Sequence, residues 1–383
     1  MKITRLDLFH VAPRWQFLKI STDEGICGWG EPILEGHARA VEAAVRELEP
    51  VLIGQDPRRI EALWQLMYRG AFYRGGPVQM SAVSGVEQAL WDIKGKYYHM
   101  PVYEMLGGKC RNSVRMYGHL KPAGQPGDFP VEAMLEIARQ RVREGFTVVK
   151  YSVIPPVLPI DHPSAVDRMA ERFSAVRETV GRDVDIAVDF HGRVSPAMAK
   201  QFCKALEPFH PFFVEEPCLP ENPEAMIDIA RSTVIPIAAG ERLYTRWGFR
   251  TLIESRAVSV FQPDVCHTGG ILETKKIAAM AEMNYASIAP HNPLGPISLA
   301  ACLQVDACCP NVLVQEHPGM PDHLDLGVGL LKNPFVVRNG EIAIPDGDGL
   351  GIEVDEEAVR QHRYDGKWQT PTITLPDGSM ADW

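Results

Sequence analysis

Five acidic residues and one histidine stand at the ends of six short apolar segments in the second half of the chain. They recur at intervals of roughly 25 residues, about the length of a strand, a loop, a helix and a return loop. Carboxylates bind hard cations and an imidazole exchanges protons near neutral pH, so these residue types suit metal-assisted acid–base chemistry. In chain order they are Asp189, Glu215, Glu241, Asp264, His291 and Glu316.

Regular repetition of such a unit predicts a parallel β/α barrel. In a barrel of this kind, residues at the C-terminal ends of the strands share one mouth. We therefore predict an α/β fold of the TIM-barrel type, with the six side chains gathered around one point. The eight expected strands are residues 113–118, 147–152, 184–190, 211–217, 235–241, 258–264, 285–291 and 312–316.

Three of the acids, Asp189, Glu215 and Glu241, are predicted to bind a divalent cation. Three carboxylates on adjacent strands cannot all stay ionised without a countercharge. Mg²⁺ prefers oxygen ligands, so we expect one Mg²⁺ per subunit, with Mn²⁺ as the alternative. Glu216 neighbours Glu215 and points the opposite way in a strand, which favours Glu215 as the ligand. Ordinary salt bridges, such as Arg242 with Glu241, or acids at helix N-caps are the competing explanations.

His291 is the candidate base, because Asp264 ends the preceding strand and can fix the tautomer of its ring. His191 follows Asp189 by two residues and is expected on the same side, as an acid beside the metal. Glu316 is expected to hydrogen-bond charge that develops on a substrate oxygen, if it is protonated, or simply to orient the substrate.

Composition narrows the class of protein. The chain has 383 residues, 45% of them hydrophobic, which suits one large domain with a smaller one. Its net charge of −10 and the lack of a basic stripe argue against a nucleic-acid partner. No apolar run is long enough to span a membrane. The eight cysteines form no CxxC pair, so we expect free thiols and a cytoplasmic location.

The predicted organisation has three parts: an α+β capping domain over residues 1–110, the barrel over residues 111–327, and a tail over residues 328–383 that returns to the capping domain. A hairpin with an Asn-Gly turn is expected at residues 336–344. The Pro-rich stretch 151–163 is expected to overhang the mouth. Polar residues in loops and at a strand end are candidates for substrate binding, although ordinary turns also contain such residues; these are Arg14, Glu35, His37, Arg74 and Lys150.

Several motifs together resemble the enolase superfamily, in particular its mandelate racemase branch and the galactonate dehydratases within it. The resemblance spans nearly the whole chain. Its barrel motifs are Asp-Phe-His-Gly (189–192), Glu-Glu-Pro (215–217), Ala-Gly-Glu-Arg (239–242), Gln-Pro-Asp (262–264), Ala-Pro-His (289–291) and Gln-Glu (315–316). Further motifs lie at residues 14–20, 28–32, 72–77, 88–96, 191–195 and 293–297.

The resemblance implies an enolase-like barrel in which Mg²⁺ binds the substrate carboxylate and stabilises an enediolate. A His or Lys base that works beside Mg²⁺ is typical of this superfamily. By the same resemblance His291, paired with Asp264, takes the C2 proton of an acid sugar. His191 then protonates the departing C3 hydroxyl, and Glu316 hydrogen-bonds the enediolate.

One departure from the branch is informative. Racemases there have Lys-x-Lys at the end of the second strand, whereas this chain has Lys150-Tyr151-Ser152. Ser152 cannot exchange a proton with carbon, which favours one-base elimination over racemisation. Together with this departure, the resemblance implies a hydro-lyase that converts D-galactonate to 2-keto-3-deoxy-D-galactonate. Mannonate, gluconate, arabinonate and galactarate are alternative substrates, and an inactive acid-sugar-binding homologue is the alternative class. A homo-oligomer is expected.

Overall fold

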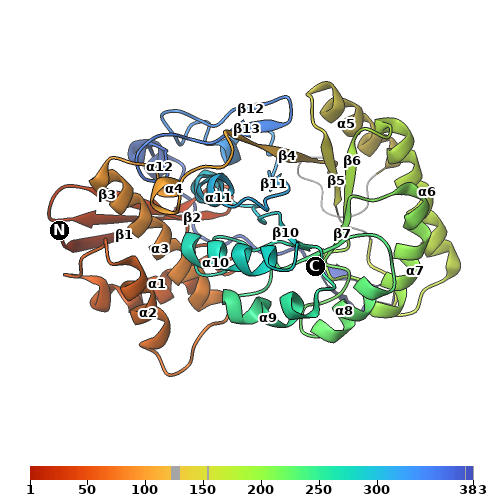
Figure 1. Cartoon of the computed structure of the whole chain (residues 1–383), viewed down its shortest axis with the longest axis horizontal. Coiled ribbons are helices and arrows are strands. Elements are labelled where there is room, and N and C mark those ends of the chain that lie inside the picture. The colour runs from red at the N-terminus through yellow and green to blue at the C-terminus, as the bar shows by residue number, and fades with distance from the viewer. Residues whose placement is uncertain (122–129, 153–154, 376, 383) are drawn as a thin grey trace.

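The computed structural model describes residues 1–121, 130–152, 155–375 and 377–382. Figure 1 shows an elongated molecule with an antiparallel sheet and its helices at one end and a helix-covered barrel at the other. In the described ranges, no helix is both long enough and apolar enough to cross a membrane. The predicted fold class, a β/α barrel with an N-terminal α+β unit, is confirmed.

The N-terminal unit is a three-stranded antiparallel sheet covered by helices. Helix α3 packs against the sheet so closely that a Cβ at Gly30 would lie 1.9 Å from the carbonyl oxygen of Gly85, so only glycine fits there. The elements are β1 (Ile3–Val11), β2 (Trp15–Thr22), β3 (Cys27–Gly30), α1 (Ala38–Leu52), α2 (Ile60–Arg69), α3 (Pro77–Tyr98) and α4 (Val102–Met105).

Eight parallel strands follow in the described part of the chain, at the positions predicted from the sequence but mostly shorter. Strand β11 pairs with β4, and an isolated bridge between Ile288 and Val312 links the last strands, so the sheet closes on itself. The strands are β4 (Ser113–His119), β5 (Val148–Ser152), β6 (Asp185–Asp189), β7 (Phe213–Glu215), β8 (Ile237–Ala239), β9 (Val260–Phe261), β10 (Ser287–Ile288) and β11 (Gln315–Glu316).

Among the residues described, seven helices alternate with these strands and cover the outside of the barrel (Figure 1). Proline at the first turn starts four of them, where its missing N–H costs no hydrogen bond. They follow the strands in the alternating order that the predicted repeat requires. They are α5 (Val131–Arg143), α6 (Pro163–Val180), α7 (Pro196–Leu206), α8 (Pro223–Arg231), α9 (Thr245–Ser255), α10 (Ile271–Glu282) and α11 (Pro296–Cys308).

One buried side chain from each strand region fills the barrel interior. These residues form a hydrophobic cluster of their own, separate from the large core between strands and helices. Such a packed interior is typical of a β/α barrel and gives the mouth a solid floor. The cluster consists of Tyr117, Val148, Ala187, Phe213, Ala238, Val260, Ala289 and Val314.

Two buried glutamates of the N-terminal unit hold the barrel helices. Glu31 accepts hydrogen bonds from the amides of Gly295 and Ser298 at the start of α11, at 2.8 and 2.9 Å. Glu87 on α3 accepts from the first amides of α10 in the same way. Carboxyl oxygens at a helix N-terminus accept from N–H groups that have no partner within the helix. These contacts fix the N-terminal unit against the barrel.

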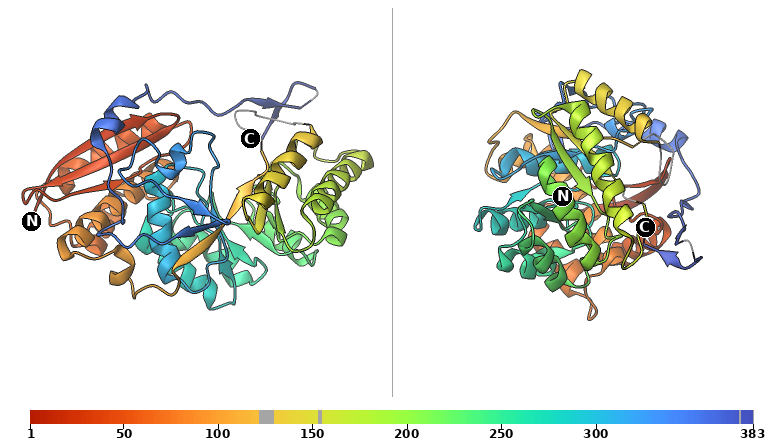
Figure 2. Two further views of the ribbon diagram at one scale, coloured as in Figure 1. Left: turned by 90° about the horizontal axis from the view of Figure 1, so that it is seen from above. Right: turned by 90° about the vertical axis from the view of Figure 1, so that its right-hand side faces the viewer.

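The C-terminal tail lies partly against the barrel and partly against the N-terminal unit. The hairpin expected at residues 336–344 exists as β12 (Val337–Arg338) and β13 (Glu341–Ala343), and β13 pairs with β4 of the barrel. Helix α12 (Glu356–Gln361) lies near β1, and Arg363 bridges Val11. Figure 2 shows the last residues running from α12 across to the barrel. They end in a small hairpin of β14 (Ile373–Thr374) and β15 (Met380–Ala381).

Candidate functional site

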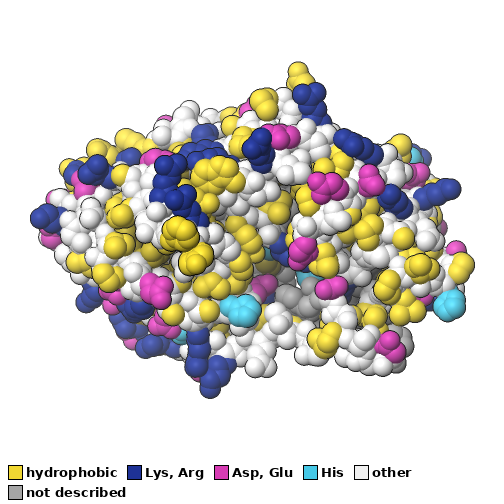
Figure 3. Space-filling model, turned by 90° about the horizontal axis from the view of Figure 1, so that it is seen from below, with side chains coloured by type: hydrophobic (Ala, Val, Ile, Leu, Met, Phe, Trp, Pro, Cys, Tyr) yellow, Lys and Arg dark blue, Asp and Glu magenta, His cyan; other side chains and the backbone are white. Residues whose placement is uncertain are grey.

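A cavity of about 460 Å³ lies at the C-terminal ends of the barrel strands. Side chains from the barrel, from the loop after β1 and from the C-terminal tail line it. Figure 3 shows one face of the molecule, with a hollow near its centre that holds acidic, basic and histidine side chains. Of the twelve residues predicted for the site, Arg14, Glu35, Lys150, Asp189, His191, Glu241, His291 and Glu316 line this cavity.

Most of these side chains occupy one layer, directly above the hydrophobic cluster in the barrel. Asp189 follows Ala187 by two residues, and His291 follows Ala289 in the same way. Alternate residues of a strand point to the same side, so the layer after the cluster faces the mouth. Four more residues likewise follow a residue of the hydrophobic cluster by two positions on their own strands: His119, Lys150, Glu215 and Glu316. The strand pattern therefore positions the site.

Asp189 and Glu215 are register partners on β6 and β7, and a lysine ammonium lies between them. Lys150 Nζ is 2.5 Å from Glu215 Oε1, 3.5 Å from Asp189 Oδ2 and 3.3 Å from Glu316 Oε1. The ammonium and the three carboxylates are each less than 6% exposed. Lys150 thus supplies part of the countercharge that the acids need.

Lys150 alone does not compensate the negative charge of the acids around it. Burial, with the nearby carboxylates of Asp189, Glu316 and Glu241, raises the pKa of Glu215 well above its usual value despite Lys150. Its Oε2 is buried and has no hydrogen-bond partner among the described residues. Burial acts to raise the pKa of Asp189 as well, but Lys150 and His191 outweigh it, so that pKa is lowered. An unpartnered carboxylate oxygen beside other acids fits a divalent cation.

The three predicted metal ligands stand at the mouth but are not drawn together. Among the residues that the structure describes, no three His, Cys, Asp or Glu side chains form a group ready to hold a metal ion. Lys150 accounts for part of this, because its ammonium contacts Asp189 and Glu215 while Glu241 lies toward His291, at 3.7 Å. The oxygen donors suit Mg²⁺ in kind, and their roles as ligands stay a prediction.

Glu216 has a different environment from its neighbour Glu215. Its carboxylate accepts from the amide of Gly240 at 2.8 Å and from Arg242 Nη2 at 2.7 Å. Its backbone takes a φ of 40°, which turns the chain out of the strand. The salt bridge considered from the sequence, Arg242 with Glu241, is therefore made with Glu216 instead. Glu216 is engaged in structure, and Glu215 is the acid left facing Lys150.

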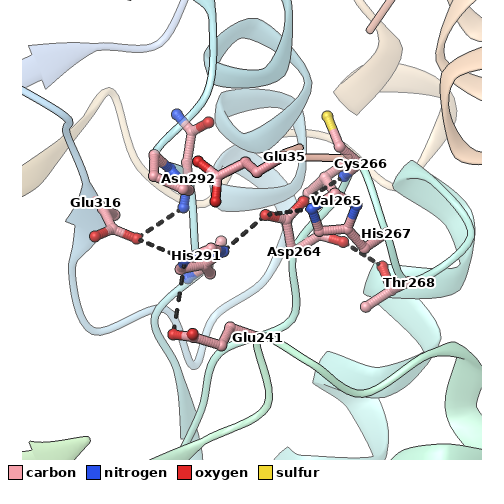
Figure 4. Close-up of polar contacts among 12 residues, drawn as sticks. Glu35, Glu241, Asp264, Val265, Cys266, His267, Thr268, His291, Asn292 and Glu316 are labelled. Atoms are coloured by element: carbon pink, nitrogen blue, oxygen red, sulfur yellow. Dashed lines mark hydrogen bonds and ion pairs between the residues drawn. The ribbon is translucent and has the colours of Figure 1, made fainter. Parts of the chain in front are cut away.

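His291 and Asp264 form the predicted pair (Figure 4). Their backbones make a parallel bridge, and His291 Nδ1 lies 2.7 Å from Asp264 Oδ2. The other oxygen of Asp264 accepts from the amide of Cys266 at 2.7 Å. This pair fixes Nδ1 of His291 as a donor and leaves Nε2 directed at Glu241 and Glu316, 3.7 and 3.9 Å away.

The surroundings make His291 more basic than a free imidazole. Burial acts to lower its pKa, but the carboxylates of Glu241, Glu316 and Asp264 outweigh burial and raise the pKa well above its usual value. Asp264 gives His291 the fixed orientation that a general base requires. The raised pKa holds a proton on the ring near neutral pH, and positive charge beside Glu241 would oppose this effect of the carboxylates.

Glu316 is held by three groups. It accepts from Lys150, from the amide of Asn292 at 2.9 Å, and His119 Nε2 lies 3.2 Å away. Burial acts to raise its pKa, but Lys150 and His291 lower it well below its usual value. These contacts favour the carboxylate form. Of the two roles predicted for Glu316, orientation of a substrate fits this form, and donation from a protonated carboxyl does not.

His191 lies at the mouth for a different reason from the one predicted. Strand β6 ends at Asp189, and His191 takes a φ of 55°, so strand alternation does not extend to it. Its amide donates to Asp189 Oδ1 at 2.7 Å, which folds the chain back over the acid. His191 still lines the cavity beside Asp189, where an acid was expected.

The predicted substrate-binding residues divide into two sets. Arg14 and Glu35 form an ion pair at the cavity wall, and Arg14 also donates to the carbonyl of Pro293 at 3.0 Å. Lys150 lies at the floor. His37 and Arg74 are exposed and do not line the cavity. Residues 153–154 of the stretch 151–163 lie outside the described ranges, and the predicted overhang stays a prediction.

Sequence reasoning missed several residues of the cavity. His119 ends β4 and, like the other site residues at strand ends, follows a residue of the barrel cluster by two positions. The predicted strand stopped one residue before it. His267 lies in the loop after Asp264, and Thr370 comes from the C-terminal tail, far along the chain from the last barrel strand. No local pattern marks Thr370. The other missed residues are Leu34, Lys121, Arg242, Tyr244, Pro293 and Pro318.

Two family models match the chain. Residues 11–107 match the N-terminal domain of the mandelate racemase/muconate lactonizing enzyme family. Residues 133–358 match the enolase C-terminal domain-like family.

The chain is similar over its full length to proteins named D-galactonate dehydratase. It is 48% identical to that of Variovorax paradoxus (strain S110), 49% to that of Verminephrobacter eiseniae (strain EF01-2) and 46% to that of Cronobacter sakazakii (strain ATCC BAA-894). Each alignment covers 100% of both chains.

Solved structures show the same fold. A member of the enolase superfamily from Salmonella Typhimurium superposes with a TM-score of 0.88 at 35% identity, over 94% of this chain and 98% of that one. A mandelate racemase/muconate lactonizing enzyme from Jannaschia sp. CCS1 superposes with a TM-score of 0.88 at 34% identity, over 96% and 98%.

Proposed function

The chain belongs to the enolase superfamily, and on that premise we propose that it is an acid-sugar dehydratase that converts D-galactonate to 2-keto-3-deoxy-D-galactonate and water. The observation that supports this most directly is the His291–Asp264 pair, whose Nε2 faces buried acids at the mouth of the barrel. The full-length likeness to proteins named D-galactonate dehydratase supports the substrate.

Asp189, Glu215 and Glu241 are the residues that we propose to hold a divalent cation, Mg²⁺. All three offer oxygen donors, all are at most 8% exposed, and Glu215 Oε2 has no hydrogen-bond partner in the described part of the chain. When bound, the cation supplies positive charge against which a substrate carboxylate can be placed, and this lowers the cost of removing the neighbouring proton. Lys150 would then contact the same carboxylate or Glu316.

His291 begins the reaction by taking the proton from C2 at Nε2. The electron pair of the C2–H bond moves toward the carboxylate, and Asp264 stabilises the imidazolium through Nδ1–H. The pair then returns to form the C2–C3 double bond as the C3–O bond breaks. His191 donates a proton to the departing hydroxyl, which leaves as water. The enol product takes up a proton at C3 and loses the proton of its C2 hydroxyl, and so becomes the 2-keto-3-deoxy acid.

The end of β5 argues for elimination with a single base. Ser152 pairs in register with Asp189, at the position where racemases of this branch have a second lysine. A serine hydroxyl is not basic enough at neutral pH to take a proton from carbon. After His291 has removed the proton, the residue at that position therefore cannot deliver a proton to the opposite face of C2, as racemisation requires.

A panel of acid sugars tests the proposal. With Mg²⁺ present, D-galactonate should yield a 2-keto-3-deoxy acid, detected as its semicarbazone. Mannonate, gluconate, arabinonate and galactarate should react more slowly. The His291→Asn variant is the matched control and should yield no product. Turnover of another acid sugar alone would correct the substrate, and binding without product across the panel would end the proposal of a dehydratase.

A further inference from the structure

His267 lines the catalytic cavity but has no role in the chemistry described above. It lies in the loop between β9 and α10, three residues after Asp264, and is 7% exposed. Figure 4 shows its ring beside the carboxylate of Asp264. The amide of His267 donates to the Asp264 carbonyl at 3.0 Å, so the backbone of the loop is fixed next to the catalytic pair.

The hydrogen bonds of Ser81 determine the tautomer of this ring. Ser81 Oγ lies 2.7 Å from the carbonyl oxygen of Pro77, one turn earlier in α3. A carbonyl only accepts, so the Ser81 hydroxyl hydrogen is used in that bond. His267 Nδ1 lies 2.9 Å from the same Oγ. Because the hydroxyl oxygen can only accept from the ring, Nδ1 carries the hydrogen.

In the neutral ring of His267, the other nitrogen is then an acceptor. Nε2 lies 3.6 Å from Asp264 Oδ2, beyond hydrogen-bond distance, whereas His291 Nδ1 donates to that oxygen at 2.7 Å. Two acceptors that face each other repel unless a donor lies near both. The hydroxyl groups of an acid sugar are such donors, and His267 lines the cavity in which a substrate would bind.

We propose that His267 is a substrate-binding residue whose Nε2 accepts a hydrogen bond from a hydroxyl of the acid sugar, in a tautomer that Ser81 of the N-terminal unit sets. This inference rests on the proposed function. It makes α3 part of the specificity apparatus, because a side chain of the N-terminal unit decides which hydrogen-bonding role a barrel residue offers to the substrate.

The test is steady-state kinetics with D-galactonate. His267→Phe keeps a planar ring but removes the acceptor, and it should raise KM about tenfold while kcat falls less than about threefold, as for loss of one polar contact to a ligand. His267→Gln, which retains polar atoms, is the second variant in case the first does not fold. Ser81→Ala removes the hydroxyl oxygen that holds the hydrogen on Nδ1 of His267, so the hydrogen can lie on either ring nitrogen. This variant should raise KM about threefold.

Ser84 supplies the matched control. It lies one turn after Ser81 on α3, donates to the Met80 carbonyl at 2.7 Å and accepts from the amide of Gly269 at 2.9 Å. It does not line the cavity. Ser84→Ala should therefore lower stability without a change in KM. An equal rise of KM in Ser84→Ala and Ser81→Ala would show a general loosening of the loop and would overturn the proposal.

Monodeoxy analogues of the substrate identify the hydroxyl. One analogue should bind the unsubstituted enzyme more weakly than D-galactonate does. The His267→Phe variant should bind that same analogue and D-galactonate equally well, because the contact is already missing. If every analogue loses the same factor in both enzymes, or if KM is unchanged in both His267 variants, His267 contacts no hydroxyl.

Calorimetry in a His291→Asn background separates this inference from the proposed function. If the unsubstituted enzyme binds D-galactonate but releases no product, the proposed function is wrong. The Kd for D-galactonate, compared between proteins with and without His267→Phe, would still show whether His267 contacts the substrate. A chain that binds no acid sugar overturns both.

Discussion

The ammonium of Lys150 lies 2.5 Å from Oε1 of Glu215, and both side chains are almost fully buried. The acids around Lys150 raise its pKa well above the usual value, although burial alone would lower it. The site therefore contains a fixed cation that helps to lower the pKa of Asp189 and of Glu316, whereas the pKa of Glu215 stays raised. Loss of this cation, or of the acids around it, should change both stability and metal binding.

Replacing Lys150 by Met should destabilise the metal-free protein by about 3–5 kcal/mol, because it leaves buried carboxylates without their countercharge. Urea unfolding in a chelator measures this, and excess Mg²⁺ should reduce the loss. Lys367→Met is the control, since Lys367 pairs with Asp365 at the surface, at 3.2 Å. Exposed pairs contribute about 0–1 kcal/mol. Equal losses in the two variants would contradict a special role for Lys150.

Mg²⁺ should raise the stability of the protein, and Glu215→Gln should abolish that effect. A ligand present at about 100 times its Kd stabilises the native state by about 2.7 kcal/mol. Thermal unfolding with and without Mg²⁺ is the measurement, and Asp189→Asn should behave like Glu215→Gln. Glu216→Gln is the matched control, because Glu216 bonds Arg242 and Gly240. Loss of the Mg²⁺ effect in Glu216→Gln alone would reverse the assignment of ligands.

Asp264→Asn should lower kcat by about 10²–10⁴-fold, the range of a general acid–base contribution. The amide cannot stabilise the imidazolium of His291, and it can present an N–H to Nδ1 and impose the wrong tautomer. Product release at saturating substrate measures kcat, and the stabilisation by Mg²⁺ should be unchanged. A variant that keeps its activity but loses the Mg²⁺ effect would make Asp264 a metal ligand.

Glu31 should make stability fall as the pH rises. Burial raises its pKa to about 8, against 4.5 for the usual carboxyl, although amides of Gly295 and Ser298 act to lower it. The folded state therefore holds a proton that the unfolded chain releases above its own pKa. The contribution is fully present below pH 4.5 and is lost as the pH rises to about 8, with a slope of at most about 1.4 kcal/mol per pH unit.

Glu31→Gln isolates this effect, because the amide does not titrate in that window. The difference in urea unfolding free energy between the unsubstituted protein and the variant should fall from about pH 5 to about pH 8. A difference that is flat, or that grows with pH, would show that the hydrogen bonds from α11 keep Glu31 ionised. Glu61→Gln is a useful control, since Glu61 is about half exposed.

The site was predictable where a strand pattern reaches it. Asp264 and His291 end consecutive strands, so their proximity follows from the repeat alone, and the structure brings them to 2.7 Å. The choice between Glu215 and Glu216 follows from strand alternation in the same way. His191 lies beside Asp189 as predicted, but not because of strand alternation. The strand ends before His191, whose own left-handed backbone redirects the chain.

Besides the metal ligands, the cellular location and the oligomeric state, two further interpretations from the sequence remain predictions. The division of the chain at residues 110 and 327 is one of them. The overhang of the stretch 151–163 above the mouth is the other, and protease sensitivity with and without substrate would test it. The expected contacts of His37 and Arg74 with substrate find no support at the cavity, since both side chains lie exposed away from it.

By itself the sequence determined the barrel, its eight strands and the acids and histidine at their ends, because these depend on local periodicity that one segment already contains. Only the tertiary structure decided that Lys150 compensates Glu215, that the tail brings Thr370 to the cavity, and that Ser81 sets the ring of His267. The first of these contacts joins residues 65 positions apart, and the last joins residues 186 positions apart. Their strength depends on burial and on close distances, which no local pattern specifies.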